Sequence, residues 1–263
     1  MRWELLSTRR LGALDRGIPV VLNIAAIEQH GPHLPLATDS LVGEHFLSQI
    51  DSRLSEEVLL LPQLKVCCSS HHMDFPGTLT VSHETLLTYV GEVFDSVASH
   101  GFRKLVIFNS HGGNEAIGRV LLEKWGAANP RARIFMLTWW RVAARELAVV
   151  QESGFGGVGH ACEFETSLLL HFAPHLVAGE LIPEPTLKPT FPWAEADMLN
   201  APCGQMYRSM WEMSGGNGVV GAPRYASATK GARISAIVTD KLCTMLADIR
   251  AAEAGPGRPA VTL

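Results

Sequence analysis

The stretch that most constrains the fold is residues 105–114, where a strand-like apolar run leads directly into a turn rich in polar residues and glycine. Leu105-Val106-Ile107-Phe108 is short, apolar and rich in residues that favour strands, which predicts a strand buried on both faces. Asn109-Ser110-His111-Gly112-Gly113-Asn114 then turns the chain, and the composition of residues 115–125 predicts a helix. This order places His111 just past the carboxyl end of a central strand, where open α/β sheets bind their ligands.

The same order of strand, loop and helix recurs along the chain. Further strands are predicted at residues 19–26, 58–66 and 133–137, and helices at residues 40–50, 82–100, 163–172 and 229–252. Pro62 interrupts the second of these strands, which places it at a sheet edge. The alternation predicts right-handed βαβ units and a mostly parallel sheet, and therefore an α/β fold. A length of 263 residues is compatible with one hydrophobic core, so we expect a single domain over residues 1–263.

Composition argues against several classes of protein. The net charge of −4 and the scattered Lys and Arg residues argue against nucleic acid as a partner, because phosphate binding needs clustered positive charge. No apolar stretch reaches the roughly 20 residues that span a bilayer, and the first residues lack the apolar core of a signal peptide. We therefore expect no membrane partner. Five cysteines without a Cys-x-x-Cys spacing argue against a disulfide framework or a zinc ribbon, and favour the reducing cytoplasm.

Side chains that bind cations stand in the loops and helix starts that follow the predicted strands. Glu28 and His30 are two residues apart, so on an extended chain their side chains face the same way. His160 and Glu163 are three residues apart, which places both on one face of a helix that begins there. The side chains that could bind a cation are those of Glu28, His30, Asp39, His111, His160 and Glu163. Imidazoles and carboxylates together suit Zn²⁺, Mn²⁺ or Fe²⁺.

A charge count favours two cations over one. Glu28, Asp39 and Glu163 would bring three negative charges into one cleft, and a single divalent ion leaves that site negative. Two divalent ions with three carboxylates and one hydroxide sum to zero, which a buried site tolerates much better. We therefore expect two divalent ions.

Each candidate ligand also has a plain structural explanation. Asp39 taken alone fits a helix cap. Glu28 and His30 fit a solvated turn, and His160 fits a loop histidine with a structural hydrogen bond. His111 is harder to explain in this way, because a core histidine would lie within apolar periodicity. The presence of all these residues in loops at one expected sheet edge favours a metal site.

A second group of side chains is expected to contact the substrate. Its members are His72, Ser110, Asn114, Trp139 and Trp140. Asn114 fits a cap of the following helix equally well, and the two tryptophans fit core or subunit-interface packing at least as well as a pocket wall. Residues 179–220 carry no motif that can be interpreted, and they are expected to shape the pocket.

Several motifs, taken in order, resemble the creatininase (creatinine amidohydrolase) family. They are Glu28-Gln29-His30-Gly31-Pro32-His33-Leu34-Pro35-Leu36 with Thr38-Asp39, His72 with Phe75-Pro76-Gly77-Thr78, Gly101-Phe102-Arg103, Asn109-Ser110-His111-Gly112-Gly113-Asn114, His160-Ala161-Cys162-Glu163-Phe164-Glu165-Thr166-Ser167, and a weaker Gly221-Ala222-Pro223 with Lys230-Gly231. Together they cover most of residues 20–232. The combination is specific for the family, although not for one activity within it.

The resemblance implies a three-layer α/β/α sandwich with a dinuclear metal site, often assembled as a hexamer, that hydrolyses amide bonds. By motif match it also implies the roles of single residues. The implied metal ligands are Glu28, His30, Asp39, His111 and Glu163. Asp39 would bridge the two ions, and His160 would transfer protons, so that His160 and Glu163 are the residues expected in catalysis.

The sequence differs from creatininase itself at one position. There a glutamate ligand stands two residues after the strand-end histidine, whereas here that position is Gly113, which makes Glu163 the expected substitute. Relatives with the Gly-Gly-Asn form include deformylases of pyrimidine intermediates, a peptidase that trims a redox-cofactor precursor, and a hydrolase of an oxidised inositol. Creatinine is therefore not implied as the substrate.

The working hypothesis is hydrolysis of a small-molecule amide, of the cyclic-amide or formamide type, through a metal-bridged water. In this hypothesis His160 protonates the leaving nitrogen. One alternative keeps the site and changes the bond, to a lactone, a carbon–carbon bond beside a ketone, or a peptide of a cofactor precursor. Another is a non-catalytic module that binds phosphate at Gly112-Gly113.

Overall fold

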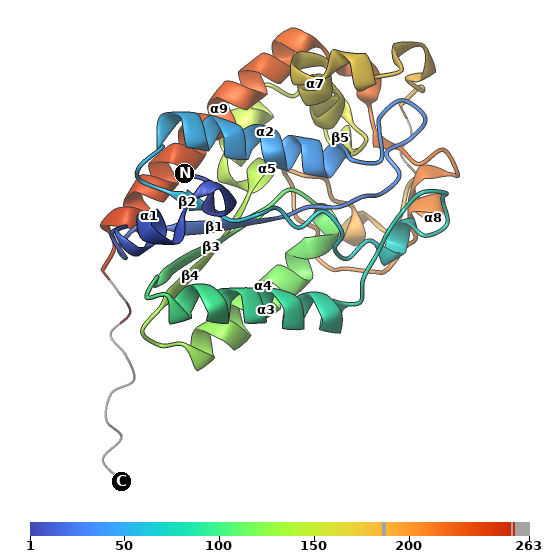
Figure 1. Ribbon diagram of the computed structural model, residues 1–263. Helices are drawn as coiled ribbons and strands as arrows, with labels where there is room; N and C mark the ends of the chain where they lie inside the picture. Colours follow the sequence, from blue (N-terminus) through green and yellow to red (C-terminus); the bar gives the residue numbers. More distant parts are fainter. Residues whose placement is uncertain (186–187, 254, 256–263) are drawn as a thin grey trace.

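The computed structural model describes residues 1–185, 188–253 and 255 (Figure 1). The rest of the expected domain 1–263, namely residues 186–187, 254 and 256–263, lies outside this description. The main sheet has the strand order β2-β1-β3-β4, and all its strands are parallel. Its strands are β1 (Val20–Ile24), β2 (Leu59–Leu60), β3 (Lys104–Asn109) and β4 (Arg133–Thr138). A small antiparallel sheet pairs β5 (Val158–His160) with β6 (Val220–Gly221).

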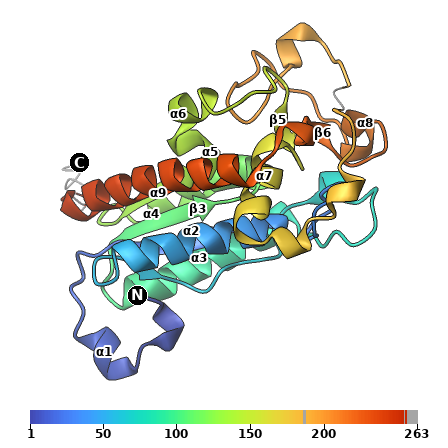
Figure 2. The same ribbon diagram turned by 90° about the horizontal axis from the view of Figure 1, so that it is seen from above.

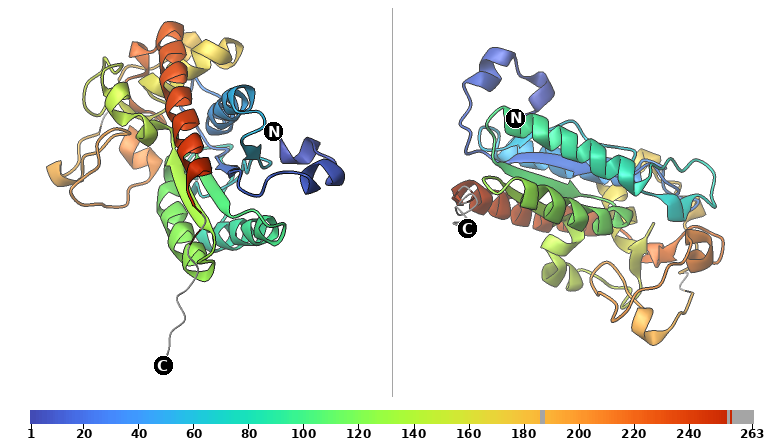
Figure 3. Two further views of the ribbon diagram at one scale, coloured as in Figure 1. Left: turned by 90° about the vertical axis from the view of Figure 1, so that its left-hand side faces the viewer. Right: turned by 90° about the horizontal axis from the view of Figure 1, so that it is seen from below.

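Helices cover the main sheet on both faces. The α-helices are α1 (Thr8–Gly12), α2 (Thr38–Arg53), α3 (His83–Ser99), α4 (Glu115–Ala128), α5 (Trp139–Val142), α6 (Ala144–Ala148), α7 (Glu163–Phe172), α8 (Met210–Ser214) and α9 (Ala228–Ala251). Figure 2 shows α2 and α9 lying side by side over one face of the sheet. Figure 3 shows α3 and α4 on the opposite face.

Strand residues alternate between two hydrophobic cores. Val21 and Val106 belong to the core that includes side chains of α2, α7 and α9. Leu22 and Ile107, their neighbours in sequence, belong to the core that includes side chains of α3 and α4. Burial of each such side chain stabilises the fold by about 1.5–3 kcal/mol. A sheet buried on both faces explains the continuously apolar strands and confirms the expected three-layer α/β/α sandwich.

Most of the predicted elements are found within a few residues of their expected bounds. Ser82 begins α3 as expected, since its hydroxyl accepts a hydrogen bond from the N–H of Thr85. The strand interrupted by Pro62 is the short edge strand β2. Asp39 is not the cap of α2, because the helix begins at Thr38 and its N-cap is Ala37. The pair β5–β6 was not predicted, since its two short strands are more than fifty residues apart and contain glycine.

Among the described residues, no helix combines the length and the apolar character that a bilayer span requires.

Candidate metal centre

The loops that follow β1 and β3 leave the sheet at the same level. The two strands pair in parallel with Ile24 opposite Asn109. Glu28 and His30 lie on the loop after β1, and His111 comes just after β3. Asp39 lies in the first turn of α2, which starts at the end of the same loop. The topology therefore brings four of the expected ligands to one edge of the sheet.

Glu28, Asp39 and His111 form one group of converging ligand atoms. Nδ1 of His111 lies 3.2 Å from Oε1 of Glu28 and 3.0 Å from Oδ2 of Asp39. Nε2 of the same ring lies 3.0 Å from the carbonyl oxygen of Cys68, to which it donates a hydrogen bond. Burial opposes a charge on this ring, but Glu28 and Asp39 raise the pKa of His111 well above its ordinary value. Once Nδ1 has released its proton, its lone pair faces the two carboxylates as a ligand atom.

His30, Glu165 and His160 form a neighbouring group. Nε2 of His30 lies 3.3 Å from Oδ1 of Asp39 and 4.0 Å from Oε1 of Glu165. Nδ1 of His30 is held by the carbonyl oxygen of Glu28, 3.1 Å away. The two carboxylate oxygens of Asp39 thus face different imidazoles, His111 and His30. This is the arrangement expected of a carboxylate that bridges two cations.

Several of these ligand atoms are buried without a hydrogen-bond partner in the described residues. They are both carboxylate oxygens of Glu28, Oδ2 of Asp39 and Nε2 of His30. Their short contacts within the cluster are ion-pair distances to neighbouring ligand atoms. A buried polar atom without a partner destabilises a fold by about 1–3 kcal/mol, and a charged one by more. Divalent cations that accept oxygen and nitrogen ligands would satisfy all four atoms, so the donor set fits such ions.

The cluster combines buried acids and imidazoles that shift one another's pKa values. Burial raises the pKa of Glu165 to about 7, against the influence of His30. Burial alone would lower the pKa of His30, but Asp39 and the other carboxylates raise it to about 9. Burial opposes ionisation of Asp39 as well, yet His30 and His111 hold its pKa below the ordinary value. His30 therefore carries positive charge among the carboxylates at neutral pH and must release a proton before it can bind a metal ion.

Glu163 lies apart from this cluster, and its expected role as a ligand is corrected. Its Oε1 accepts a hydrogen bond from the N–H of Glu152 and lies 2.5 Å from Nζ of Lys230, while Oε2 accepts from the N–H of Ser153. The side chain is fully buried, and these partners occupy both of its oxygens. Two residues along an α-helix turn the side chain by about 200°, so Glu165 points the other way. Oε2 of Glu165 accepts from the N–H of Cys162, which leaves Oε1 to face His30.

Sequence reasoning missed Glu165, although it stands in the same motif. Both glutamates lie in the first turn of α7, and each is a plausible capping residue or ligand. No local pattern distinguishes them, because the choice depends on which side of α7 meets Lys230. The available signal was the pair of acids itself, in a helix start whose other side chains are uncharged.

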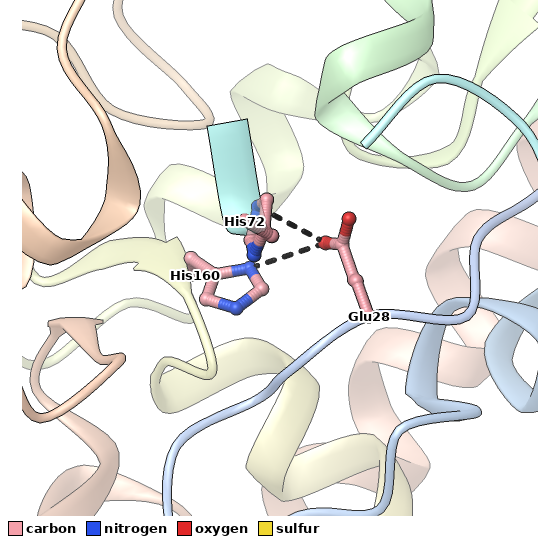
Figure 4. Close-up of side chains that lie close together, drawn as sticks. All are labelled: Glu28, His72 and His160. Carbon is pink, nitrogen blue, oxygen red and sulfur yellow. Dashed lines mark ion pairs between the residues drawn. The ribbon is translucent and has the colours of Figure 1, made fainter. Parts of the chain in front are cut away.

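His160 and His72 approach Glu28 from two other segments (Figure 4). Nδ1 of His160, at the end of β5, lies 3.6 Å from Oε1 of Glu28, and Nε2 of His72 lies 3.3 Å from the same oxygen. Burial and the neighbouring histidines lower the pKa of both rings. Both rings are therefore neutral at pH 7.

Two of the residues expected to contact substrate instead stabilise the loops. The carboxamide of Asn114 accepts a hydrogen bond from the N–H of Cys68 and donates one to the carbonyl oxygen of Ala25. Asn114 is the N-cap residue of α4 by position, but its side chain makes no capping hydrogen bond there. The buried hydroxyl of Ser110 accepts from the carboxamide of Asn23.

The two tryptophans differ in position. Trp139 is fully buried and stacks against Phe46 of α2, so it is a core residue. Trp140 lines a cavity of about 230 Å³ that opens beside the cluster. Met198 and Met210 also line this cavity. Part of the uninterpreted stretch 179–220 therefore does form a wall of the pocket.

The chain has clear relatives among known proteins. The family model Creatininase, described as creatinine amidohydrolase, matches residues 4–246. A mycofactocin precursor peptide peptidase from Mycobacterium tuberculosis is 30% identical over 235 residues, which cover 84% of this chain and 81% of that protein. A creatinine amidohydrolase from Pseudomonas putida is 31% identical over 173 residues, which cover 60% of this chain and 65% of that protein.

Solved structures share the fold. One described as "Creatininase Mn" superposes with a TM-score of 0.74 at 23% identity, covering 94% of this chain and 97% of that chain. A mutant creatininase described as "Zn-Zn type" superposes with a TM-score of 0.73 at 23% identity, with the same coverage of 94% and 97%. These similarities extend over nearly the whole of both chains.

Proposed function

Since the chain belongs to the creatininase family of hydrolases, we propose that it cleaves an amide bond in a small molecule with the help of two divalent metal ions. The observation that carries this proposal is the set of buried, unpartnered ligand atoms of Glu28, His30 and Asp39 beside a cavity. The relatives named for manganese and zinc support these metals as candidates, with Fe²⁺ as a third.

The ligands divide into two sets that share one carboxylate. Glu28, Asp39 and His111 would hold one ion. His30 and Glu165 would hold the other together with the second oxygen of Asp39. Three carboxylates remain in the set when Glu165 replaces Glu163, so the charge count still favours two ions over one. When bound, such ions supply Lewis-acid chemistry, which polarises a carbonyl group and acidifies water.

The hydrogen bonds of His160 support a role in proton transfer. Its Nε2 donates to the carbonyl oxygen of Gln29, 2.7 Å away, so the neutral ring has its lone pair on Nδ1. Nδ1 lies 3.6 Å from Oε1 of Glu28, and the side chain of His160 also converges with those of His30 and Glu165. His160 would accept a proton from the attacking water at Nδ1 and then donate it to the leaving nitrogen.

The size and lining of the cavity support a small substrate. A volume of about 230 Å³ suits a small molecule or the end of a chain, and Trp140 provides a flat apolar wall. A cyclic amide or formamide is the class we favour. A peptide is the second candidate, because the relative from Mycobacterium tuberculosis that matches over 84% of this chain is named as a precursor peptide peptidase.

Metal analysis of the purified protein, followed by a substrate panel, tests the proposal. We expect two divalent ions per chain and release of an amine or ammonia from cyclic amides, formamides or short peptides. Release of acid alone, from a lactone or a ketone-activated carbon–carbon bond, would favour the alternative hydrolase. Phosphate affinity without bound metal would favour the non-catalytic module instead. His160→Ala should retain both ions and lose turnover.

Assembly and location form part of the same proposal. Residues 191–211 expose several aromatic side chains, including Phe191, Trp193, Tyr207 and Trp211. Such exposure supports a homo-oligomer, with a hexamer as the family resemblance implies. A cytoplasmic location accords with five cysteines that are all free. Sedimentation analysis checks the assembly.

A further inference from the structure

The side chain of Gln29 lies between two histidines of the pocket in an orientation that its own surroundings determine. Oε1 of Gln29 accepts a hydrogen bond of 2.9 Å from the N–H of Gly31. Since only the carbonyl end of the amide accepts, this bond identifies Oε1 and Nε2 without ambiguity. Gly218 packs against the same oxygen so closely that a Cβ atom there would lie 2.1 Å from it. The amide is therefore held in one orientation.

Nε2 of Gln29 consequently faces the two imidazoles. It lies 3.0 Å from Nδ1 of His72 and 3.1 Å from Nε2 of His160. An amide nitrogen only donates, so any ring nitrogen that bonds to it must carry a lone pair.

The backbone of Gln29 determines which of the two histidines receives this bond. Nε2 of His160 lies 2.7 Å from the carbonyl oxygen of Gln29, which only accepts. Nε2 of His160 must therefore carry hydrogen, and it has no lone pair for the amide. The amide hydrogen of Gln29 is left to His72, whose Nδ1 is the acceptor.

A neutral imidazole carries one hydrogen, so these bonds determine both tautomers. His72 has its hydrogen on Nε2, whereas His160 has a lone pair on Nδ1. These are the two atoms that approach Oε1 of Glu28, at 3.3 Å and 3.6 Å (Figure 4). The pocket thus presents one hydrogen-bond donor and one acceptor side by side.

We infer that Gln29 is a positioning residue that holds His72 and His160 in tautomers presenting opposite groups to the pocket. His72 then presents an N–H beside Oε1 of Glu28 in the lining of the cavity, where an oxygen atom of the substrate, such as a carbonyl or carboxylate oxygen, would share it. Of these two rings, only His160 has a lone pair on the nitrogen that faces the pocket, so only His160 can accept a proton there. The catalytic meaning of this arrangement rests on the proposed function, but the tautomers themselves do not.

The tautomer of His72 also bears on metal binding. The side chains of Glu28, His72 and His160 are close enough together to hold a cation of their own. A ring nitrogen that carries hydrogen cannot bind a metal ion. While the amide of Gln29 donates to Nδ1, His72 therefore cannot act as a ligand through Nε2, which excludes a further cation held by Glu28, His72 and His160.

The tautomers can be read by ¹⁵N–¹H correlation spectra of the metal-free protein labelled at histidine, near pH 8. His72→Gln assigns the signals of His72 by their disappearance, and His160→Gln does the same for His160. In the unsubstituted protein we expect hydrogen on Nε2 of both rings. Hydrogen on Nδ1 of His72 would overturn the inference.

Two substitutions of Gln29 sharpen the test. In Gln29→Glu a carboxylate oxygen, which accepts a hydrogen bond, replaces the amide nitrogen that donated one to Nδ1 of His72. The tautomer of His72 with its hydrogen on Nδ1 should therefore become the favoured one. Gln29→Leu removes the donor, and His72 should then populate both tautomers. His160 is the internal control, because its partner is the backbone carbonyl oxygen, and its signals should keep the same pattern in both variants.

A tautomer of His72 that stays unchanged in both folded variants would refute the role of Gln29. A merely structural role would alter stability without moving the hydrogen between ring nitrogens. Failure of the proposed function is detected separately, by metal content and substrate release in the unsubstituted protein. The role of Gln29 and the proposed function can therefore be refuted independently of each other.

Discussion

Replacement of Glu163 by glutamine tests whether the two glutamates of α7 have different roles, which the sequence alone does not distinguish. In the structure Glu163 is the buried partner of Lys230, whose side chain is only 5% exposed. Removing one partner of a buried ion pair typically destabilises a protein by about 3–5 kcal/mol, because the other charge stays buried and unpaired. The ligand cluster contains Glu165 and does not include Glu163. Glu163→Gln should therefore weaken the fold and leave the metal content unchanged.

The expected loss lies near the lower end of that range. Lys230 keeps a second carboxylate, that of Glu152 at 3.3 Å, and a hydrogen bond to the carbonyl oxygen of Tyr225 at 2.6 Å. Glu152 is largely exposed, so water screens its charge and it compensates only in part. We expect a loss of about 3 kcal/mol in the free energy of unfolding. For a chain of this size that corresponds to a fall of roughly 6–12 °C in Tm.

Urea unfolding of the metal-free protein followed by tryptophan fluorescence measures the loss, and elemental analysis after dialysis measures the metal. Glu165→Gln is the matched control, since it changes a glutamate two residues away on the same helix. It should lose one of the two ions and alter the unfolding midpoint little. Adding Lys230→Met to Glu163→Gln should recover much of the stability, because it removes the unpaired charge. A Glu163→Gln protein that loses an ion while its unfolding midpoint stays the same would refute this reasoning.

Three further predictions concern the centre and the fold around it. Gly113→Ala should weaken metal binding at least tenfold, since a Cβ there would lie 2.4 Å from Nε2 of His111. Gly112→Ala is the control and should bind metal as before, because a Cβ at that position has no neighbour within 4 Å. Equal affinities of the two variants in a metal titration would contradict this geometry. Asp39→Asn should lose both ions rather than one, and elemental analysis showing one ion retained at full occupancy would exclude a bridging role. Burial lowers the pKa of His45 from 6.5 to about 4, so the unfolded chain binds the extra proton and stability should fall as the pH drops from 6.5 towards 4. Because the ring is only half-buried, we expect a loss of roughly 1–2 kcal/mol in the free energy of unfolding. The measurement compares the urea midpoints of His45→Gln and the unsubstituted protein over this pH range. The same pH dependence in both proteins would contradict the prediction.

The amino-acid sequence by itself determined the layers of the fold and the edge at which the site lies. Apolar runs such as residues 105–108 specify strands buried on both faces, and a strand of that kind needs helices on each side. Polar residues that directly follow two such strands must meet, because adjacent parallel strands end at the same edge of a sheet. Glu28, His30 and His111 were therefore identified as candidate ligands from local patterns alone.

Only the tertiary structure decided which of several equivalent side chains enter the site. Glu163 and Glu165 share one motif and one helix turn, and the position of Lys230, more than sixty residues away, decides which of them faces His30. Trp139 and Trp140 are likewise neighbours, yet one packs in the core and the other lines the cavity. Such choices depend on partners that are distant in sequence, and periodicity within a single segment carries no information about those partners.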